Sequence, residues 1–90
     1  MELYTFLMEF RGGTYISQVS SSTLVDAVKA WAYELSVDGI KHLGIKGKNE
    51  IIKNIDEIDL SPIDTVINVY CFCLRIKAGF IIVNVIKTSK

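Results

Sequence analysis

The chain has 90 residues, with ten Lys or Arg against ten Asp or Glu, one Pro, two Cys and 50% apolar residues. A chain of this length buries only about 60–65% of the surface that its unfolded form exposes, so we expect a single compact domain over 1–90. The composition excludes a disordered tail, a collagen-like repeat and a disulfide framework, and the zero net charge argues against a domain built mainly to grip phosphate.

The first predicted element is a strand over Leu3 to Phe10, where large apolar residues alternate with mixed ones. Gly12-Gly13 follows at once, and two glycines there are typical of a two-residue hairpin turn, because both central residues need φ > 0. A turn centred on the glycines pairs Phe10 with Tyr15. That register keeps the apolar side chains of both strands on one side, whereas a slip of one residue mixes the two faces.

A helix is predicted over about 23–36. Thr23, with Asp26 three positions later, has the form of a capping box, in which the hydroxyl accepts from a free backbone N–H of the first turn. An apolar stripe at helical spacing follows: Leu24, Val28, Trp31 and Leu35. We expect the helix to stop by Asp38-Gly39, because glycine takes a left-handed C-terminal position without steric strain.

Residues 40–64 carry a weaker pattern, since Gly44 and Gly47 interrupt it. The segment Asn49 to Ile58 fits a second, shorter helix by the spacing of its isoleucines, although β-branched residues also suit a strand. Ser61-Pro62 should end this segment, because the residue before a proline is pushed away from the helical region.

Two more strands are predicted at Val66 to Ile76 and Phe80 to Ile86, joined by Lys77-Ala78-Gly79. With Gly79 as the left-handed last residue of a three-residue loop, Leu74 faces Ile82. The predicted fold is therefore α+β. It is a four-stranded antiparallel sheet from two hairpins with one long helix and, if 49–58 is helical, a short second one, in the order ββα(α)ββ.

Both sides of the last hairpin are apolar, which is unusual for a sheet with one face in water. We expect the Trp31 helix to cover the side with Cys71 and Cys73, since small side chains allow a helix to approach closely. The bulky side then forms an association surface for a second copy or another protein, made of Tyr70, Phe72, Leu74, Phe80 and Ile82. The alternative is that residues 40–64 fold across this side.

A basic stretch before and within the second predicted helix suits an anion or a nucleic-acid backbone. Its members are Lys41, His42, Lys46, Lys48 and Lys53. Four acidic residues follow between Asp56 and Asp64 and would compete for these charges. A solvated loop and helix face is therefore the competing interpretation.

The sequence contains no pattern that points to a cofactor, a metal or a catalytic centre. Cys71-x-Cys73 differs from the Cys-x₂₋₄-Cys knuckle of zinc sites and has no second ligand pair, because His42 is the one histidine. Without a Ser/His/Asp or Cys/His motif, we expect a non-catalytic protein. A pocket near His42, Tyr33 or Tyr70 is the small-ligand or enzyme alternative.

Two observations favour a cytoplasmic location. An acidic residue, Glu2, stands where a secretory signal needs Lys or Arg. The longest apolar run, Ala78 to Val83, is far shorter than the roughly 20 residues that cross a bilayer. We therefore expect no membrane span, and free thiols at Cys71 and Cys73.

The first third of the chain resembles the HicB-like antitoxin domain, in which a hairpin precedes a helix and another strand. The resemblance rests on the opening strand, on the returning strand from Gly13-Thr14-Tyr15-Ile16, and on the helix start from Thr23 to Ala27. Gln18 to Ser22 replace the family's Pro-Gly-Cys-like element, so no site residue is carried over. The resemblance implies an antitoxin-like regulator, which stands beside a nucleic-acid-binding protein as an alternative to a small self-associating interaction module.

Overall fold

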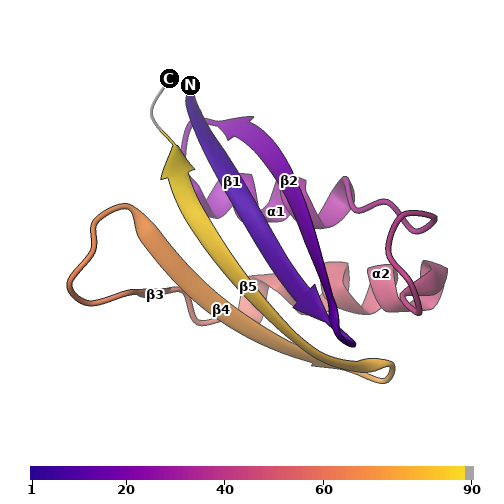
Figure 1. The fold of residues 1–90 in the computed structure, drawn as a ribbon. Coiled ribbons are helices and arrows are strands. Elements are labelled where there is room, and N and C mark those ends of the chain that lie inside the picture. Colours follow the sequence, from indigo (N-terminus) through magenta and orange to yellow (C-terminus); the bar gives the residue numbers. More distant parts are fainter. Residues whose placement is uncertain (89–90) are drawn as a thin grey trace.

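A twisted antiparallel sheet with two helices on one face forms the protein in the computed structural model, which describes residues 1–88 (Figure 1). In chain order its elements are β1 (Glu2–Phe10), β2 (Gly13–Ser21), α1 (Leu24–Tyr33), α2 (Gly44–Asn54), the short 3₁₀ helix η1 (Ile55–Glu57), β3 (Ser61–Pro62), β4 (Val69–Ile76) and β5 (Gly79–Thr88). The strand order is β2-β1-β5-β4-β3. The predicted α+β class is confirmed, but within residues 1–88 the sheet has five strands instead of four.

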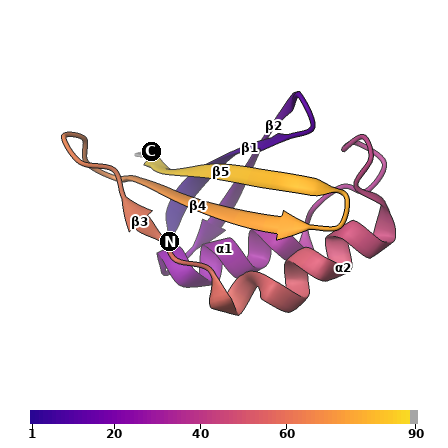
Figure 2. The same ribbon diagram turned by 90° about the horizontal axis from the view of Figure 1, so that it is seen from below.

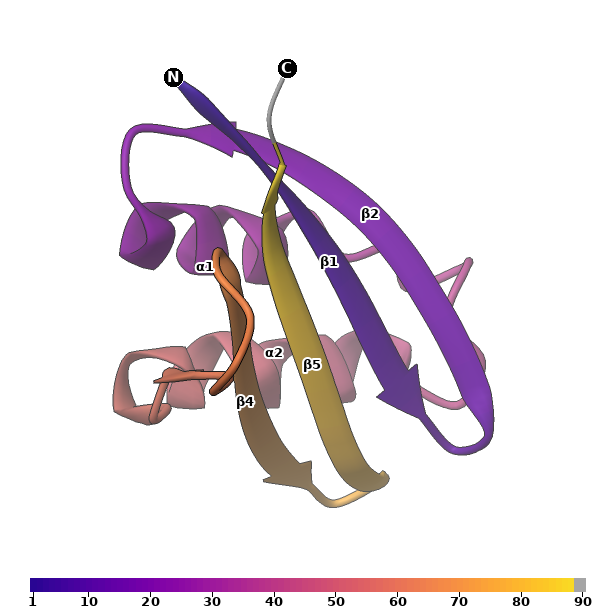
Figure 3. The same ribbon diagram turned by 60° about the vertical axis from the view of Figure 1, so that its left-hand side comes forward.

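Both helices lie on the same side of the sheet (Figure 2). Helix α1 packs on β2 and β1, and α2 lies beside α1 and contacts β4. Seen from the other side, strands β2, β1 and β5 lie in front of both helices, and the segment between β3 and β4 crosses in front of the start of β4 (Figure 3). One side of the sheet is therefore the core side, and the other is the open face, which is directed toward solvent.

Trp31 occupies the middle of the core. Its indole stacks on the Phe6 ring at 5.4 Å between centroids and meets the Phe72 ring edge-on at 5.6 Å. The helix that carries Trp31 therefore covers the bulky side of the last hairpin. Our expectation that it would cover the side with Cys71 and Cys73 is wrong, because the large aromatic rings themselves supply the surface against which α1 packs.

The first hairpin has the predicted tight turn, but the turn is centred on Arg11 and Gly12. Phe10 pairs with Gly13, so the predicted pairing with Tyr15 is wrong by two residues. Arg11 and Gly12 both have positive φ, 49° and 83°, as a type I′ turn requires. Because the shift is an even number of residues, the apolar side chains still share one face, as expected.

The second hairpin also has a two-residue turn, and here the predicted register is wrong by one residue. Gly79 pairs with Ile76 within the ladder instead of ending a three-residue loop, and Leu74 faces Ile81 instead of Ile82. A shift of one residue exchanges the faces of one strand relative to the other. Phe72 and Leu74 therefore share the core side with the odd-numbered residues of β5.

Helix α1 is capped as predicted, since the Thr23 hydroxyl accepts from the Asp26 backbone N–H at 3.1 Å. The helix ends at Tyr33, short of the predicted 36. Helix α2 begins at Gly44, five residues before the expected start. Gly47 is buried inside it, and a Cβ there would lie 3.3 Å from the end of the Ile76 side chain, so this glycine serves close packing instead of a loop.

The fifth strand is the pair Ser61–Pro62, which lies against β4 with Ser61 opposite Cys71. The helical segment ends at Glu57, before the Ser61-Pro62 pair that was expected to end it, and this pair is itself a short edge strand. None of the helices within residues 1–88 is long and apolar enough to cross a membrane.

Candidate functional site

The predicted association surface is divided between the two sides of the sheet. Phe72 and Leu74 are 2% and 8% exposed, because the helices cover them. Phe80, 46% exposed, and Ile82 lie on the open face, while Tyr70 shares the core side with Phe72 and is half-buried. The surface is thus wrong as a single patch. The alternative was that residues 40–64 fold across the bulky side, and α2, which belongs to this segment, does pack against β4 on that side.

The basic stretch does not gather on one face. Lys46 and Lys53 line a shallow hollow with Lys77, and Glu50 in the same hollow accepts a hydrogen bond from the Lys77 backbone N–H at 3.1 Å. Lys48 lies about 200° around the helix from Lys46. The other two members, Lys41 and His42, precede α2 in the loop. This division favours a solvated helix face with mixed charge.

The two cysteines lie on the open face of β4, opposite Asn84 and Ile82 of β5. Both are free. Burial raises the pKa of the Cys71 thiol, and the neighbouring Cys73 raises it further. A thiol held protonated in this way is a poor nucleophile. No group of three or more metal-ligating side chains occurs within residues 1–88.

Large apolar residues share the open face with polar ones such as Thr5, Gln18 and Asn84. Its large apolar residues are Leu3, Leu7, Ile16, Val69, Phe80, Ile82 and Ile86, all at least partly exposed. Among its described positions, charge occurs at Glu9 on β1 and Arg75 on β4, and the Arg75 guanidinium lies 5.2 Å from the centre of the Phe80 ring. Ile16 on β2 is 66% exposed at the margin of this apolar surface.

Strand β2 forms one free edge of the sheet. Its nine residues contain no charge and no proline, and its pairing with β1 is continuous from Gly13 to Ser21 without a bulge. Natural edge strands are usually shortened, charged, bulged or interrupted by proline, because a free edge recruits other strands. β2 has none of these protective features.

The turn fixes which backbone groups of β2 point outward. A two-residue turn closes on a hydrogen-bonded pair, here Phe10 and Gly13, and hydrogen-bonded pairs then alternate along an antiparallel ladder. Every odd-numbered residue of β2 is therefore bonded to β1. The even-numbered residues present their N–H and C=O groups to the outer side: Thr14, Ile16, Gln18 and Ser20.

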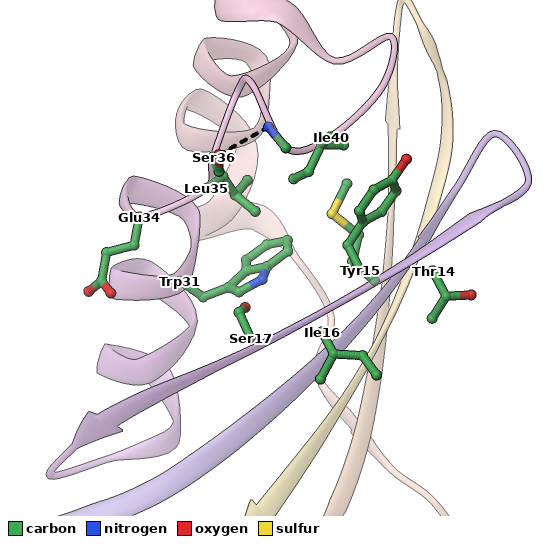
Figure 4. A pocket seen from close by; sticks show the side chains of 11 residues that line it. Thr14, Tyr15, Ile16, Ser17, Trp31, Glu34, Leu35, Ser36 and Ile40 are labelled. Atoms are coloured by element: carbon green, nitrogen blue, oxygen red, sulfur yellow. Dashed lines mark hydrogen bonds between the residues drawn. The ribbon is translucent and has the colours of Figure 1, made fainter.

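A pocket of about 370 Å³ lies beside this edge on the core side (Figure 4). Strand β2 forms one wall, the end of α1 forms the opposite wall, and the loop from Glu34 to Ile40 closes one end. Its apolar lining comes from Met8, Trp31, Leu35 and Ile40. The pocket exists because α1 ends at Tyr33, before it has covered the first half of β2.

Hydrogen bonds hold the pocket loop in place. The Tyr15 hydroxyl accepts from the Lys41 backbone N–H at 3.3 Å, and the Ser36 hydroxyl accepts from the Gly39 backbone N–H at 3.1 Å. In Figure 4 the indole nitrogen of Trp31 points toward the Ser17 side of β2, and the Glu34 carboxylate points away from the pocket. The pocket is thus apolar at its base, with polar groups at its rim.

Comparisons with known proteins give no match. No family model matches the chain, and neither a curated protein nor a solved structure does. The resemblance to the HicB-like domain therefore stays a prediction.

Sequence reasoning missed both β2 features. The edge position of β2 depends on β5 inserting beside β1, a pairing between the two ends of the chain. The pocket depends on the early end of α1. The one available signal was that residues 13–21 contain no charged residue and no proline, whereas 22% of the residues in the whole chain are charged. The arrangement offers backbone hydrogen bonds and an apolar recess to an extended ligand.

Proposed function

We propose that this chain is a small non-catalytic interaction module that binds an extended protein segment along the outer edge of β2. The proposal rests on one observation, an uncharged nine-residue edge strand next to an apolar pocket. In strand addition, backbone hydrogen bonds supply affinity, and pockets for alternate side chains supply specificity. The outward backbone groups of β2 and the apolar pocket lie next to each other.

The pocket determines what the added strand must carry. Side chains of a strand alternate between the two faces of a sheet. An extra strand beside β2 would therefore direct every second side chain to the core side, toward Trp31 and Leu35. An apolar side chain suits this recess, since apolar burial contributes about 25 cal/mol per Å².

The remaining side chains of the added strand would lie beside the open face, next to Ile16. At least partly exposed large apolar residues such as Ile16, Leu7 and Phe80 are typical of interaction surfaces when they lie close together. A cytoplasmic location, where Cys71 and Cys73 stay reduced, belongs to the same proposal.

A peptide titration followed by NMR tests the proposal. The probe is an uncharged seven-residue peptide with alternating Leu and Thr, and the control is the same peptide with every backbone nitrogen methylated, which leaves neither of its edges an N–H to donate. We expect the first peptide to shift the amide signals of Thr14, Ile16, Gln18 and Ser20, together with the Trp31 indole signal. Equal shifts with both peptides, or shifts confined to another element, would contradict the proposal.

A further inference from the structure

We infer that the strand added to β2 is β2 of a second copy of this chain, paired antiparallel about a twofold axis at Ser17 to form one continuous ten-stranded sheet. This inference rests on the proposed function and names its partner. Twofold pairing is the commonest way for one protein to associate with itself, and it brings the same surface of both copies together.

Charge is the first argument for a second copy. Ten basic and ten acidic residues are distributed over the chain, and none falls within 13–21. When a strand pairs with its own copy, any charge near the axis meets the same charge on the partner, and like charges directly opposite each other destabilise a sheet. β2 meets no such repulsion, so it is suited to pairing with itself.

The outward backbone groups provide the second argument. An axis at Ser17 pairs Ile16 with Gln18 of the partner subunit and Thr14 with Ser20 of the partner subunit. All four outward-facing residues of each copy are then hydrogen-bonded, giving about eight inter-copy hydrogen bonds. An axis at Ile16 or at Gln18 moves one end of the strand beyond its partner. The Ser17 register therefore satisfies more groups than its neighbours and uses the whole of β2.

The residue on the axis fits this geometry. Ser17 bonds to β1, so its pair across the axis is the non-hydrogen-bonded kind, in which the Cα atoms approach to about 4.5 Å. A small side chain is needed there. Ser17 is also exposed although it points to the core side, because α1 has ended beside it. The two hydroxyls have room to meet and to exchange a hydrogen bond.

The flanking side chains are compatible with this register on both faces. On the core side, Tyr15 lies opposite Val19 of the partner subunit, an aromatic and β-branched pair of the kind that stabilises antiparallel sheets. On the open side, Ile16 lies opposite Gln18 of the partner subunit. The exposed Ile16 side chain then packs against the Gln18 side chain of the partner subunit.

Charge-swap variants of the full chain, studied by sedimentation equilibrium, test the register. Ile16 and Gln18 are both exposed, so substitutions there leave the core intact, which circular dichroism and thermal melting can verify. Ile16→Lys/Gln18→Lys places two pairs of like charges opposite each other and should raise the dimer dissociation constant by up to about 30-fold. Ile16→Glu/Gln18→Glu should do the same.

Two matched controls complete the experiment. An equimolar mixture of the Lys/Lys and Glu/Glu variants should recover a heterodimer, and Ile16→Lys/Gln18→Glu should remain a dimer, because each Lys then faces a Glu of the partner subunit. In the register centred on Ile16, the Lys/Glu variant would place Lys against Lys and dissociate. Dissociation of that variant would overturn the Ser17 register.

The remaining outcomes separate this inference from the proposed function. A wild-type chain that stays monomeric at several hundred micromolar would overturn self-association. The peptide titration described above would then decide strand addition independently. A wild-type dimer that the Lys/Lys pair leaves unchanged would overturn the inference too, because the copies would meet through another surface.

Discussion

The two edges of the sheet are built in opposite ways. At one edge, β3 has two residues, and one of them is Pro62. The Ile63 backbone N–H donates to the Val69 carbonyl at 3.0 Å, so Ile63 is bonded to β4. Because bonded residues alternate along an antiparallel ladder, the nitrogen of the neighbouring Pro62 faces outward. A proline nitrogen has no N–H to donate, so it blocks pairing with a further strand at this point. Farther along β4, Arg75 borders a hollow with Glu57 and Asp59. The opposite edge, β2, is long and uncharged.

This difference indicates that the chain can protect a sheet edge and does so on one side. Proline, a short strand and charge are the usual means by which sheets avoid unwanted pairing. All three occur around β3, and none occurs in β2. The edge of β2 therefore lacks the protection against pairing that the same sheet has at its other edge.

The largest expected effect comes from removing the wall behind the β2 pocket. Trp31→Ala should lower the free energy of unfolding by about 3–5 kcal/mol, because it leaves a cavity against the Phe6 and Phe72 rings. Urea denaturation measures the loss. Trp31→Phe keeps an aromatic ring against Phe6 and should lose clearly less. A loss under about 1 kcal/mol for the alanine variant would show that α1 does not support the β2 edge.

A pair of proline substitutions separates the inner and outer sides of β2. Ser17→Pro removes an N–H that bonds to β1 and should destabilise the fold by about 3 kcal/mol. Gln18→Pro removes an outward N–H and should cost the fold about 1 kcal/mol, while it abolishes pairing with an added strand. Thermal melting and sedimentation measure the two effects. Equal destabilisation by both prolines would contradict the assigned alternation.

A smaller effect is expected at the opposite edge. Pro62→Ala restores an outward N–H on β3 and should change the free energy of unfolding by less than about 0.5 kcal/mol. The variant should associate more readily than the wild type on sedimentation at the same concentration. If its association is unchanged, the proline is not what protects that edge.

The smallest effect concerns the thiol of Cys71. Because its pKa is raised in the fold, the folded chain holds this proton more tightly than the unfolded chain does. The free energy of unfolding should therefore fall slightly as the pH rises through the alkaline range in which free thiols ionise. Denaturation of the wild type and of Cys71→Ala across that range measures the difference. A steeper fall in the variant would contradict the assigned direction.

Much of the fold could be predicted from the sequence, because its signals are local. The alternation in β1, the Thr23 cap and the apolar stripe of α1 each depend on residues a few positions apart. The α+β class follows from their order. Gly47 misled the prediction of α2, since a glycine placed for close packing against Ile76 has the same appearance in sequence as one in a loop.

The candidate site could not be predicted, because it depends on register and on distant pairing. A one-residue difference at Gly79 decides whether Phe72 and Leu74 face the helices or the solvent. β5 pairs with β1 from the other end of the chain, and that pairing leaves β2 as an edge. Hydrophobic pattern alone does not fix either feature.

Amide hydrogen exchange at two protein concentrations tests the central claim, which is that the outer edge of β2 pairs with β2 of a second copy. In dilute solution, the amides of Tyr15, Ser17 and Val19 should be protected by β1, and those of Ile16 and Gln18 should exchange rapidly. At high concentration the Ile16 and Gln18 amides should become protected as well. Rapid exchange of these two amides at every concentration would contradict the claim.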